Sequence, residues 1–305
     1  MIEMTDAKPA KPSKPAKYQC PFEFTGKEID QDGRVYKLAT KEDCLRFREL
    51  ADKTDKFVLR YDQDNILVWD RKKSGESMNL IKVFGTFKCS PATLWDMLHD
   101  AVYRVEWDQN RLEGYELSHL NERQSIGYYA AKSPTPISNR DFVNQRVWHD
   151  AGKGEYVIFN TSVPHKDMPQ RDGFVRATSK VTGYLVRPFG TEGGCCLTYL
   201  TQTDPSGWIP TFVINFATTK LVPSVIQNLR KVSDGYLDWT KKQVNHSKPW
   251  NMTSDPWSEP QSNATIELAL HRWSSTEVHS PVRPPTPKDD KPEGFDETVP
   301  AEGIA

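Results

Sequence analysis

The sequence lacks the features that mark membrane-spanning, secreted and disulfide-rich proteins. No apolar run approaches the roughly 18 residues that a membrane-crossing helix needs, and the N-terminus lacks the apolar core of a secretory signal. The five cysteines are odd in number and mostly far apart in the chain, which argues against a disulfide framework. We therefore expect a cytoplasmic protein whose thiols are reduced.

Motifs of catalysis and of metal binding are also missing. There is no G-x-S-x-G, H-E-x-x-H or C-x-x-C motif and no phosphate-cradling glycine loop. Among the seven histidines, His99 falls at the end of an expected helix and is assigned to the surface, while His149 and His165 have no acid or cysteine at a telling spacing. We expect no catalytic residue, no metal ion and no cofactor, although a site assembled only in three dimensions would leave no such spacing.

The sequence also lacks an excess of charge of either sign. The chain has 40 Lys and Arg against 41 Asp and Glu, a net charge of -1. No long-range field therefore favours nucleic acid or an acidic membrane, and we expect no nucleic-acid partner.

The composition divides the chain into three regions. Residues 1–39 begin with a Lys-Pro repeat that cannot build a core, and we expect them to form a mostly disordered leader, residues 18–39 being ambiguous. Residues 40–250 carry all the strong helix and strand patterns. Residues 251–305 are rich in proline and charge and are expected to form a disordered tail. Within it, Ile266 to Trp273 have enough apolar residues to form a helical turn or two that docks on the domain.

Strand patterns dominate the middle region. In residues 80–89, Val83, Gly85 and Phe87 face one way and Lys82 and Thr86 face the other, which indicates a half-buried strand. Short turns favour antiparallel pairing between consecutive strands. The nine candidate strands are 57–61, 66–69, 80–89, 114–120, 125–132, 141–149, 155–163, 174–187 and 195–203.

Helix patterns lie at the start, middle and end of this region. Thr40 can cap a helix that runs to about Ala51, and a second helix begins after Ser90 and continues to Asp108. There is no alternation of strand and helix, which argues against a Rossmann-type sheet. The order predicts an α+β fold with helices on one side of a curved antiparallel sheet.

Residues 207–239 predict one long amphipathic helix. Apolar residues recur with a period of 3.6, and Pro223 in the middle of this stripe should kink the helix. The pattern alone fits an ordinary core helix, but it also fits a lid with a soft point at Pro223. The residues assigned to the lid and to membrane contact are Trp208, Ile209, Phe212, Val213, Phe216 and Pro223.

Charged residues embedded in apolar patterns are the best candidates for a binding site. Arg104 and Asp108 are four residues apart, as in an exposed helical ion pair. Alternatively, Arg104 turns inward, is held by Asp108 and offers its planar donors to a buried phosphate. Asn139, Arg140 and Asp141 open a strand and either close a turn or tie the sheet to a helix.

Four ordered motifs resemble the StAR-related lipid-transfer (START) domain family and, within it, the phosphatidylcholine transfer protein subgroup. The resemblance covers about residues 40–250. The motifs are Tyr103-Arg104-x-x-Trp107-Asp108, Gly127-Tyr128-Tyr129, Pro134-x-Pro136-x-Ser138-Asn139-Arg140-Asp141-Phe142 and Asp204-Pro205-x-Gly207-x-Ile209-Pro210.

The resemblance implies a helix-grip fold, in which a curved nine-stranded antiparallel sheet and a long C-terminal helix enclose one lipid. It implies that Arg104 contacts the lipid phosphate and that Asp108 holds Arg104. It also places Tyr129 and Phe142 at two of three aromatic positions around a choline group. The third aromatic residue is replaced near Lys180, a departure that is compatible with ethanolamine headgroups.

The resemblance predicts a lipid-transfer protein rather than an enzyme. We expect a monomer that carries phosphatidylcholine or phosphatidylethanolamine through the cytoplasm, contacts membranes transiently and uses its last helix as a gate. One alternative is a lipid-gated adaptor that binds a protein partner through the proline-rich tail around residues 283–287. A less favoured alternative is an acyl-thioester hydrolase, for which the sequence shows no acid–base pair.

Overall fold

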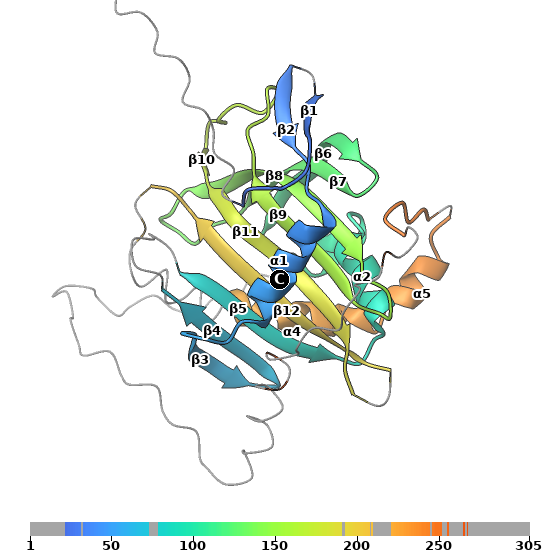
Figure 1. Cartoon of the computed structure of the whole chain (residues 1–305). Helices are drawn as coiled ribbons and strands as arrows, with labels where there is room; N and C mark the ends of the chain where they lie inside the picture. Colours follow the sequence, from blue (N-terminus) through green and yellow to red (C-terminus); the bar gives the residue numbers. More distant parts are fainter. Residues whose placement is uncertain are drawn as a thin grey trace, which may run out of the picture.

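The structure is a computed structural model of the 305-residue chain. It describes residues 22–31, 33–72, 79–190, 193–207, 209, 221–244, 246–251, 255, 265 and 267. These residues form a curved sheet with helices on both of its faces (Figure 1). Most of residues 1–39 and 251–305 lie outside the described set, so their expected disorder remains a prediction.

The elements follow the order expected for an α+β fold. The helices are α1 (Lys41–Asp52), α2 (Pro91–His99), the 3-10 turn η1 (Tyr103–Glu106), α4 (Val222–Ser233) and α5 (Tyr236–Lys241). The strands are β1 (Glu28–Gln31), β2 (Arg34–Lys37), β3 (Val58–Gln63), β4 (Ile66–Arg71), β5 (Leu80–Phe87), β6 (Arg111–Asn121), β7 (Gln124–Ala131), β8 (Asn139–Asp150), β9 (Tyr156–Ser162), β10 (Phe174–Arg176), β11 (Thr178–Pro188) and β12 (Cys195–Asp204).

Among the described residues the main sheet has ten strands, nine of which follow one antiparallel path, β3-β4-β5-β12-β11-β9-β8-β7-β6. The prediction of nine strands is confirmed by this path, and the short β10 adds a parallel pairing with β8. The segment 174–187, expected as one strand, is divided between β10 and β11. The two halves of the sheet meet where β5 pairs with β12, with Phe87 opposite Cys195.

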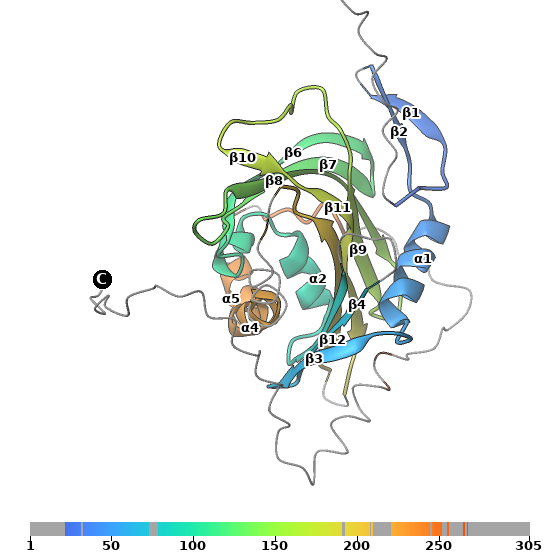
Figure 2. The ribbon, with the colours of Figure 1, turned by 90° about the vertical axis from the view of Figure 1, so that its left-hand side faces the viewer.

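The sheet curves around α2 and α4, whereas α1 packs on its other face (Figure 2). On the concave side, Leu94, Leu98, Ile226 and Leu229 share one buried cluster with residues of β4, β5 and β12. On the convex side, Phe47 of α1 stacks on Phe159 of β9, with ring centroids 5.0 Å apart. Both faces of the sheet are therefore covered, which explains why its strands show less alternation than a one-sided sheet would.

The helix starts follow the capping signals in the sequence. The backbone N–H of Thr40 donates to the carboxylate of Asp43 at 2.8 Å, and the hydroxyl of Ser90 accepts from the N–H of Thr93 at 3.2 Å. The second helix ends sooner than expected, at His99. Asp100 then accepts from the N–H groups of Val102 and Tyr103 and starts the separate turn η1.

The long C-terminal helix is confirmed in part. Within the described residues, α4 and α5 are separated at Asp234 and Gly235 rather than joined in one helix. Gly235 is a weak helix former, and the turn lets Tyr236 and Trp239 pack on Tyr103, with centroids 4.9 Å away in both cases. Helix α4 lies so close to β5 that a Cβ at Gly85 would come within 2.5 Å of Ile226 Cγ2. The missing side chain of Gly85 therefore permits this close approach.

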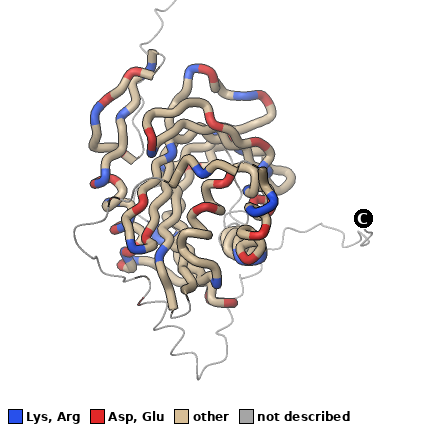
Figure 3. Tube along the Cα trace, turned by 90° about the vertical axis from the view of Figure 1, so that its right-hand side faces the viewer, with Lys and Arg blue, Asp and Glu red and all other residues tan. Residues whose placement is uncertain are grey.

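Basic and acidic positions are interspersed along the chain trace (Figure 3), in keeping with the net charge of -1. No helix of the described residues is both long and apolar enough to cross a membrane.

Lys82 is buried rather than on a solvent-facing side of β5. Only 1% of its surface is exposed, and it donates to Lys53 O at the C-terminal end of α1 and to the hydroxyl of Thr265 at 3.3 Å. Thr265 is itself fully buried and donates to Ala51 O at 2.9 Å. The strand pattern could not show this because α1 and a distant residue cover the outer face of β5.

We expect Lys82 to make stability rise with pH. Burial lowers its pKa to about 7, with Arg71 lowering it further and Asp52 and Asp55 opposing this. Unfolded Lys82 keeps its proton up to about pH 10, so the unfolded chain binds more protons than the folded chain above pH 7. Between pH 7 and 9 the free energy of unfolding should rise by up to about 1 kcal/mol per pH unit relative to Lys82→Met. Urea denaturation of both proteins at three pH values measures the difference, and parallel pH profiles would contradict it.

Candidate functional site

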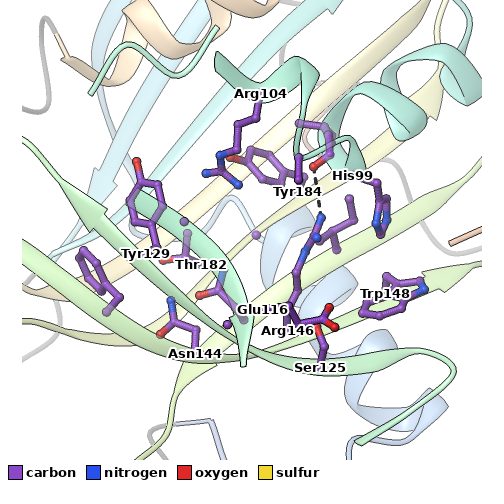
Figure 4. A pocket seen from close by; sticks show the side chains of 18 of the residues that line it. His99, Arg104, Glu116, Ser125, Tyr129, Asn144, Arg146, Trp148, Thr182 and Tyr184 are labelled. Atoms are coloured by element: carbon purple, nitrogen blue, oxygen red, sulfur yellow. Dashed lines mark hydrogen bonds between the residues drawn. The ribbon is translucent and has the colours of Figure 1, made fainter. Parts of the chain in front are cut away.

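A cavity of about 770 Å³ lies between the concave face of the sheet and the elements that cover it. This volume is within the usual range for ligand pockets. Figure 4 shows polar side chains turned into it from η1 and from several strands. Its lining includes residues of α2, η1, β6, β7, β8, β9, β11, β12 and α4, together with Pro249 and Trp250.

Arg104 and Asp108 form an ion pair in the cavity wall. Arg104 Nε lies 2.7 Å from Asp108 Oδ2, and their side chains are 30% and 11% exposed. The hydroxyl of Tyr129 donates to the same carboxylate at 3.1 Å. The pair therefore lies inward, as expected from the second interpretation of the sequence, and Asp108 fixes the plane of the guanidinium through Nε.

The surroundings of Arg104 keep its positive charge. Burial by itself would lower the pKa of Arg104, but the carboxylate of Asp108, followed by the phenols of Tyr129 and Tyr184, raises it above its ordinary value. The Arg104 Cζ atom also lies 5.0 Å from the ring centroids of Trp107 and Tyr129. A fixed, permanently charged fork of donors with Nη groups left over is suited to an oxyanion such as a phosphate.

Tyr129 and Phe142 both line the cavity, from β7 and β8. Their ring centroids are 6.2 Å apart at an interplanar angle of 41°. Phe142 is opposite Tyr129 in the antiparallel register. The two rings are therefore neighbours in the cavity wall, and their contact with a cationic headgroup remains a prediction.

A second aromatic pair was not identified from the sequence. Tyr184 and Tyr199 line the cavity from β11 and β12 and stack with centroids 5.1 Å apart at 27°. Strand alternation could have identified this pair, because Tyr184 and Tyr199 are each two residues from a threonine, Thr182 and Thr201, that faces the same side of the sheet. Lys180 does not line the cavity, since a bulge between Ser179 and Val181 shifts the register of β11.

Asn139, Arg140 and Asp141 do not line the cavity but join neighbouring segments to β8. The side chain of Asn139 accepts from the N–H of Ser133 at 3.0 Å. Asp141 is fully buried and binds Arg176 through both oxygens at 2.9 Å. Arg140 donates to Pro205 O at 3.0 Å and to Ser206 O at 2.9 Å, so it fixes the turn that precedes residue 207.

The end of the cavity next to α2 is closed by a segment that follows α5. Asp96 accepts from Trp250 Nε1 at 2.8 Å and from Asn251 Nδ2 at 3.1 Å, and it also pairs with Lys248. Trp250 stacks on His99, with centroids 5.3 Å apart at 13°.

His99 corrects one expectation from the sequence. It lies buried between Trp250 and Trp148 and not at the surface. Burial, assisted by the charge of Arg146, lowers its pKa well below the ordinary value. His99 is therefore neutral at pH 7 and packs its ring between the two indoles of the end wall.

The lid residues are only partly described. Trp208, Phe212, Val213 and Phe216 lie outside the described residues, and Ile209 is described as partly buried. Pro223 is buried in the first turn of α4, where a missing N–H is tolerated. In the described part of the chain, no group of three or more His, Cys, Asp or Glu side chains is arranged to hold a metal ion.

Comparisons with known proteins agree with the fold. Residues 42–236 match the family model described as "START domain". The chain is 35% identical over 236 residues to START domain-containing protein 10 of Homo sapiens, covering 76% of this chain and 78% of that protein. It is 28% identical over 200 residues to phosphatidylcholine transfer protein of Mus musculus, covering 64% and 92% respectively. The crystal structure of human STARD10 superimposes with a TM-score of 0.65 at 32% identity, covering 70% of this chain and 87% of that chain.

Proposed function

Because the chain belongs to the START domain family, we propose that it carries a single phospholipid, phosphatidylcholine or phosphatidylethanolamine, between membranes through the cytoplasm. Lipid binding and transfer follow from family membership and from the names of the relatives. The observation that supports a phospholipid in particular is the inward ion pair of Arg104 and Asp108, because it offers a fixed cation to a phosphate inside the cavity.

Tyr129 and Phe142 support a headgroup with a cationic nitrogen beside that phosphate. Choline and ethanolamine both carry such a nitrogen, and both are attracted to the faces of aromatic rings. The phenol of Tyr129 also binds the carboxylate of Asp108, so one residue contacts both parts of the expected headgroup site.

The size of the cargo requires a gate. Each methylene buried from water contributes about 0.8 kcal/mol, so roughly thirty methylenes of two acyl chains correspond to more than about 20 kcal/mol. An open cleft would leave much of that surface in water, and a permanently closed cavity would not exchange lipid. We assign the gate to the C-terminal segment that includes α4, with residues 208–216 contacting the membrane.

Transfer of labelled phosphatidylcholine from donor to acceptor vesicles tests this function. The purified chain should accelerate transfer over a protein-free blank and should retain one phospholipid in native mass spectrometry. Absence of both acceleration and retained lipid would refute the proposed function. Bovine serum albumin at the same concentration controls for nonspecific lipid extraction.

Pro223→Ala should change the rate of transfer by a few-fold without changing the amount of bound lipid. Alanine removes the restraint on φ that proline imposes in the first turn of α4 and so changes how readily the backbone moves there. Vesicle transfer kinetics and native mass spectrometry measure the two quantities separately. Val244→Ala, at a site that is 89% exposed, is the matched control; a Pro223→Ala rate equal to that of this control would argue against the gate.

A further inference from the structure

A second arginine, Arg146, reaches the cavity from β8. Its Nη2 donates to Leu98 O at 3.1 Å, which is its one hydrogen bond to a described residue. No carboxylate of a described residue lies within 4.0 Å of its guanidinium, in contrast to Arg104. Figure 4 shows both arginines among the side chains that line the cavity. Since a guanidinium has five N–H donors, most of the donors of Arg146 are available to a ligand.

The charge of Arg146 is retained and partly balanced from a distance. Burial, followed by the repulsion of Arg104, lowers its pKa to about 10, whereas Tyr184 and Glu116 oppose this shift. Arg146 is therefore charged at pH 7. Glu116 also lines the cavity, but its carboxylate pairs with His119 at 2.5 Å. Glu116 thus offsets part of the charge of Arg146 without accepting its N–H groups. A neutral oxygen acceptor on a ligand is sufficient to satisfy those N–H groups.

The order of residues along β8 places Arg146 between the two ends of the cavity. The lining residues of this strand are Phe142, Asn144, Arg146 and Trp148. Phe142 lies beside Tyr129 and so marks the end with the ion pair of Arg104. Trp148 contacts His99, which packs on Trp250 in the end wall. Arg146 thus lies along β8 between the end of the cavity that holds Arg104 and the end wall that contains His99 and Trp250.

In a diacyl phospholipid, the groups between the phosphate and the hydrocarbon chains are two ester carbonyls. Carbonyl oxygens accept hydrogen bonds from guanidinium groups, and a bond to a charged donor is among the stronger ones in proteins. We propose that Arg146 donates to an ester carbonyl of the bound lipid and thereby selects diacyl phospholipids over their dialkyl ether analogues. This inference rests on the proposed function.

Competition between matched lipids tests this selectivity. The full-length protein is incubated with vesicles that contain equal amounts of diacyl and dialkyl ether phosphatidylcholine of the same chain lengths, and native mass spectrometry measures the ratio of the two complexes. The wild-type protein should retain the ester lipid in about tenfold excess. Mixed lipids, with one acyl and one alkyl chain in either order, identify the carbonyl that Arg146 contacts.

Variants then connect the selectivity to Arg146. Arg146→Met removes the donors and the charge but keeps an extended side chain, and its ester-to-ether ratio should fall to about one. Arg146→Lys keeps the charge and one group of donors and should retain an intermediate ratio. Arg60→Gln, on β3 and outside the cavity lining, should behave as wild type.

The outcomes separate this inference from the function on which it rests. Equal retention of ester and ether lipids by the wild-type protein would overturn the inference while leaving phospholipid transfer intact. Retention of neither lipid would overturn the proposed function itself. An unchanged ester preference in folded Arg146→Met would also overturn the inference. If that variant does not fold, the comparison on the wild-type protein still decides the question.

Discussion

Arg104→Ala is expected to lower the affinity for phosphatidylcholine by about ten- to a hundredfold, because it removes charge-assisted hydrogen bonds to the lipid phosphate. It also leaves the carboxylate of Asp108 beside that phosphate, where two negative charges repel. The carboxylate keeps its hydrogen bond from Tyr129, so the fold should be preserved. Retained lipid in native mass spectrometry and transfer between vesicles measure the loss, and thermal unfolding checks the fold.

Two further variants separate charge from orientation at this site. Asp108→Asn keeps the charge of Arg104 but removes the carboxylate that aligns its Nε, so its loss of affinity should be smaller than that of Arg104→Ala. Arg111→Gln is the matched control, because Arg111 also lines the cavity but its guanidinium donates to Ala101 O and Gly114 O. Equal lipid occupancy in Arg104→Ala and in Arg111→Gln would refute the phosphate role of Arg104.

Asp52→Ala is expected to destabilise the protein by about 3–5 kcal/mol, because it leaves a buried arginine without its main partner. Arg187 Nη1 and Nη2 lie 2.6 and 2.7 Å from the two carboxylate oxygens of Asp52. The exposed fractions of the two side chains are 5% and 9%. Glu155 is a second partner of Arg187 at 3.2 Å, but it also pairs with Arg48 at 2.7 Å and cannot replace both bonds.

An exposed ion pair provides the control for Asp52→Ala. Asp238 and Lys241 of α5 pair at 2.8 Å with both side chains 73% exposed, and such surface pairs contribute little to stability. Asp238→Ala should therefore unfold at the same urea concentration as wild type. If Asp52→Ala and Asp238→Ala unfolded at the same urea concentration, the prediction would be wrong. The ion pair of Asp52 and Arg187 would then not stabilise the packing of α1 on the sheet.

The sequence predicted the parts of the fold that depend on local periodicity. The nine strands, the helix starts at Thr40 and Ser90, and the family were all obtained from alternation, capping residues and motif order, and the structure and the comparisons confirm them. The inward position of Arg104 could be predicted only from the resemblance, because the i,i+4 spacing is the same whether the pair faces solvent or the interior.

The features that the sequence did not show depend on contacts between distant segments. Lys82 is buried because α1 and Thr265 cover it, and Trp250 reaches the cavity because Asp96 holds it from α2. The hairpin of β1 and β2 lies in a stretch that was ambiguous by pattern. The bulge beside Lys180 changes which residues of β11 face the cavity, and strand alternation alone has no signal for such a shift.

The pairing of β5 with β12 has a consequence for how the protein is made. Strands β3 to β5 emerge early from the ribosome, but the partner of β5 is the last strand of the sheet. Until β12 is synthesised, β5 has an unpaired apolar edge, which is a template for association with other chains. Non-local pairing of this kind also slows folding. Newly made chains should therefore depend on chaperones until β12 has been synthesised, and truncation before Cys195 should produce insoluble protein rather than a smaller soluble domain.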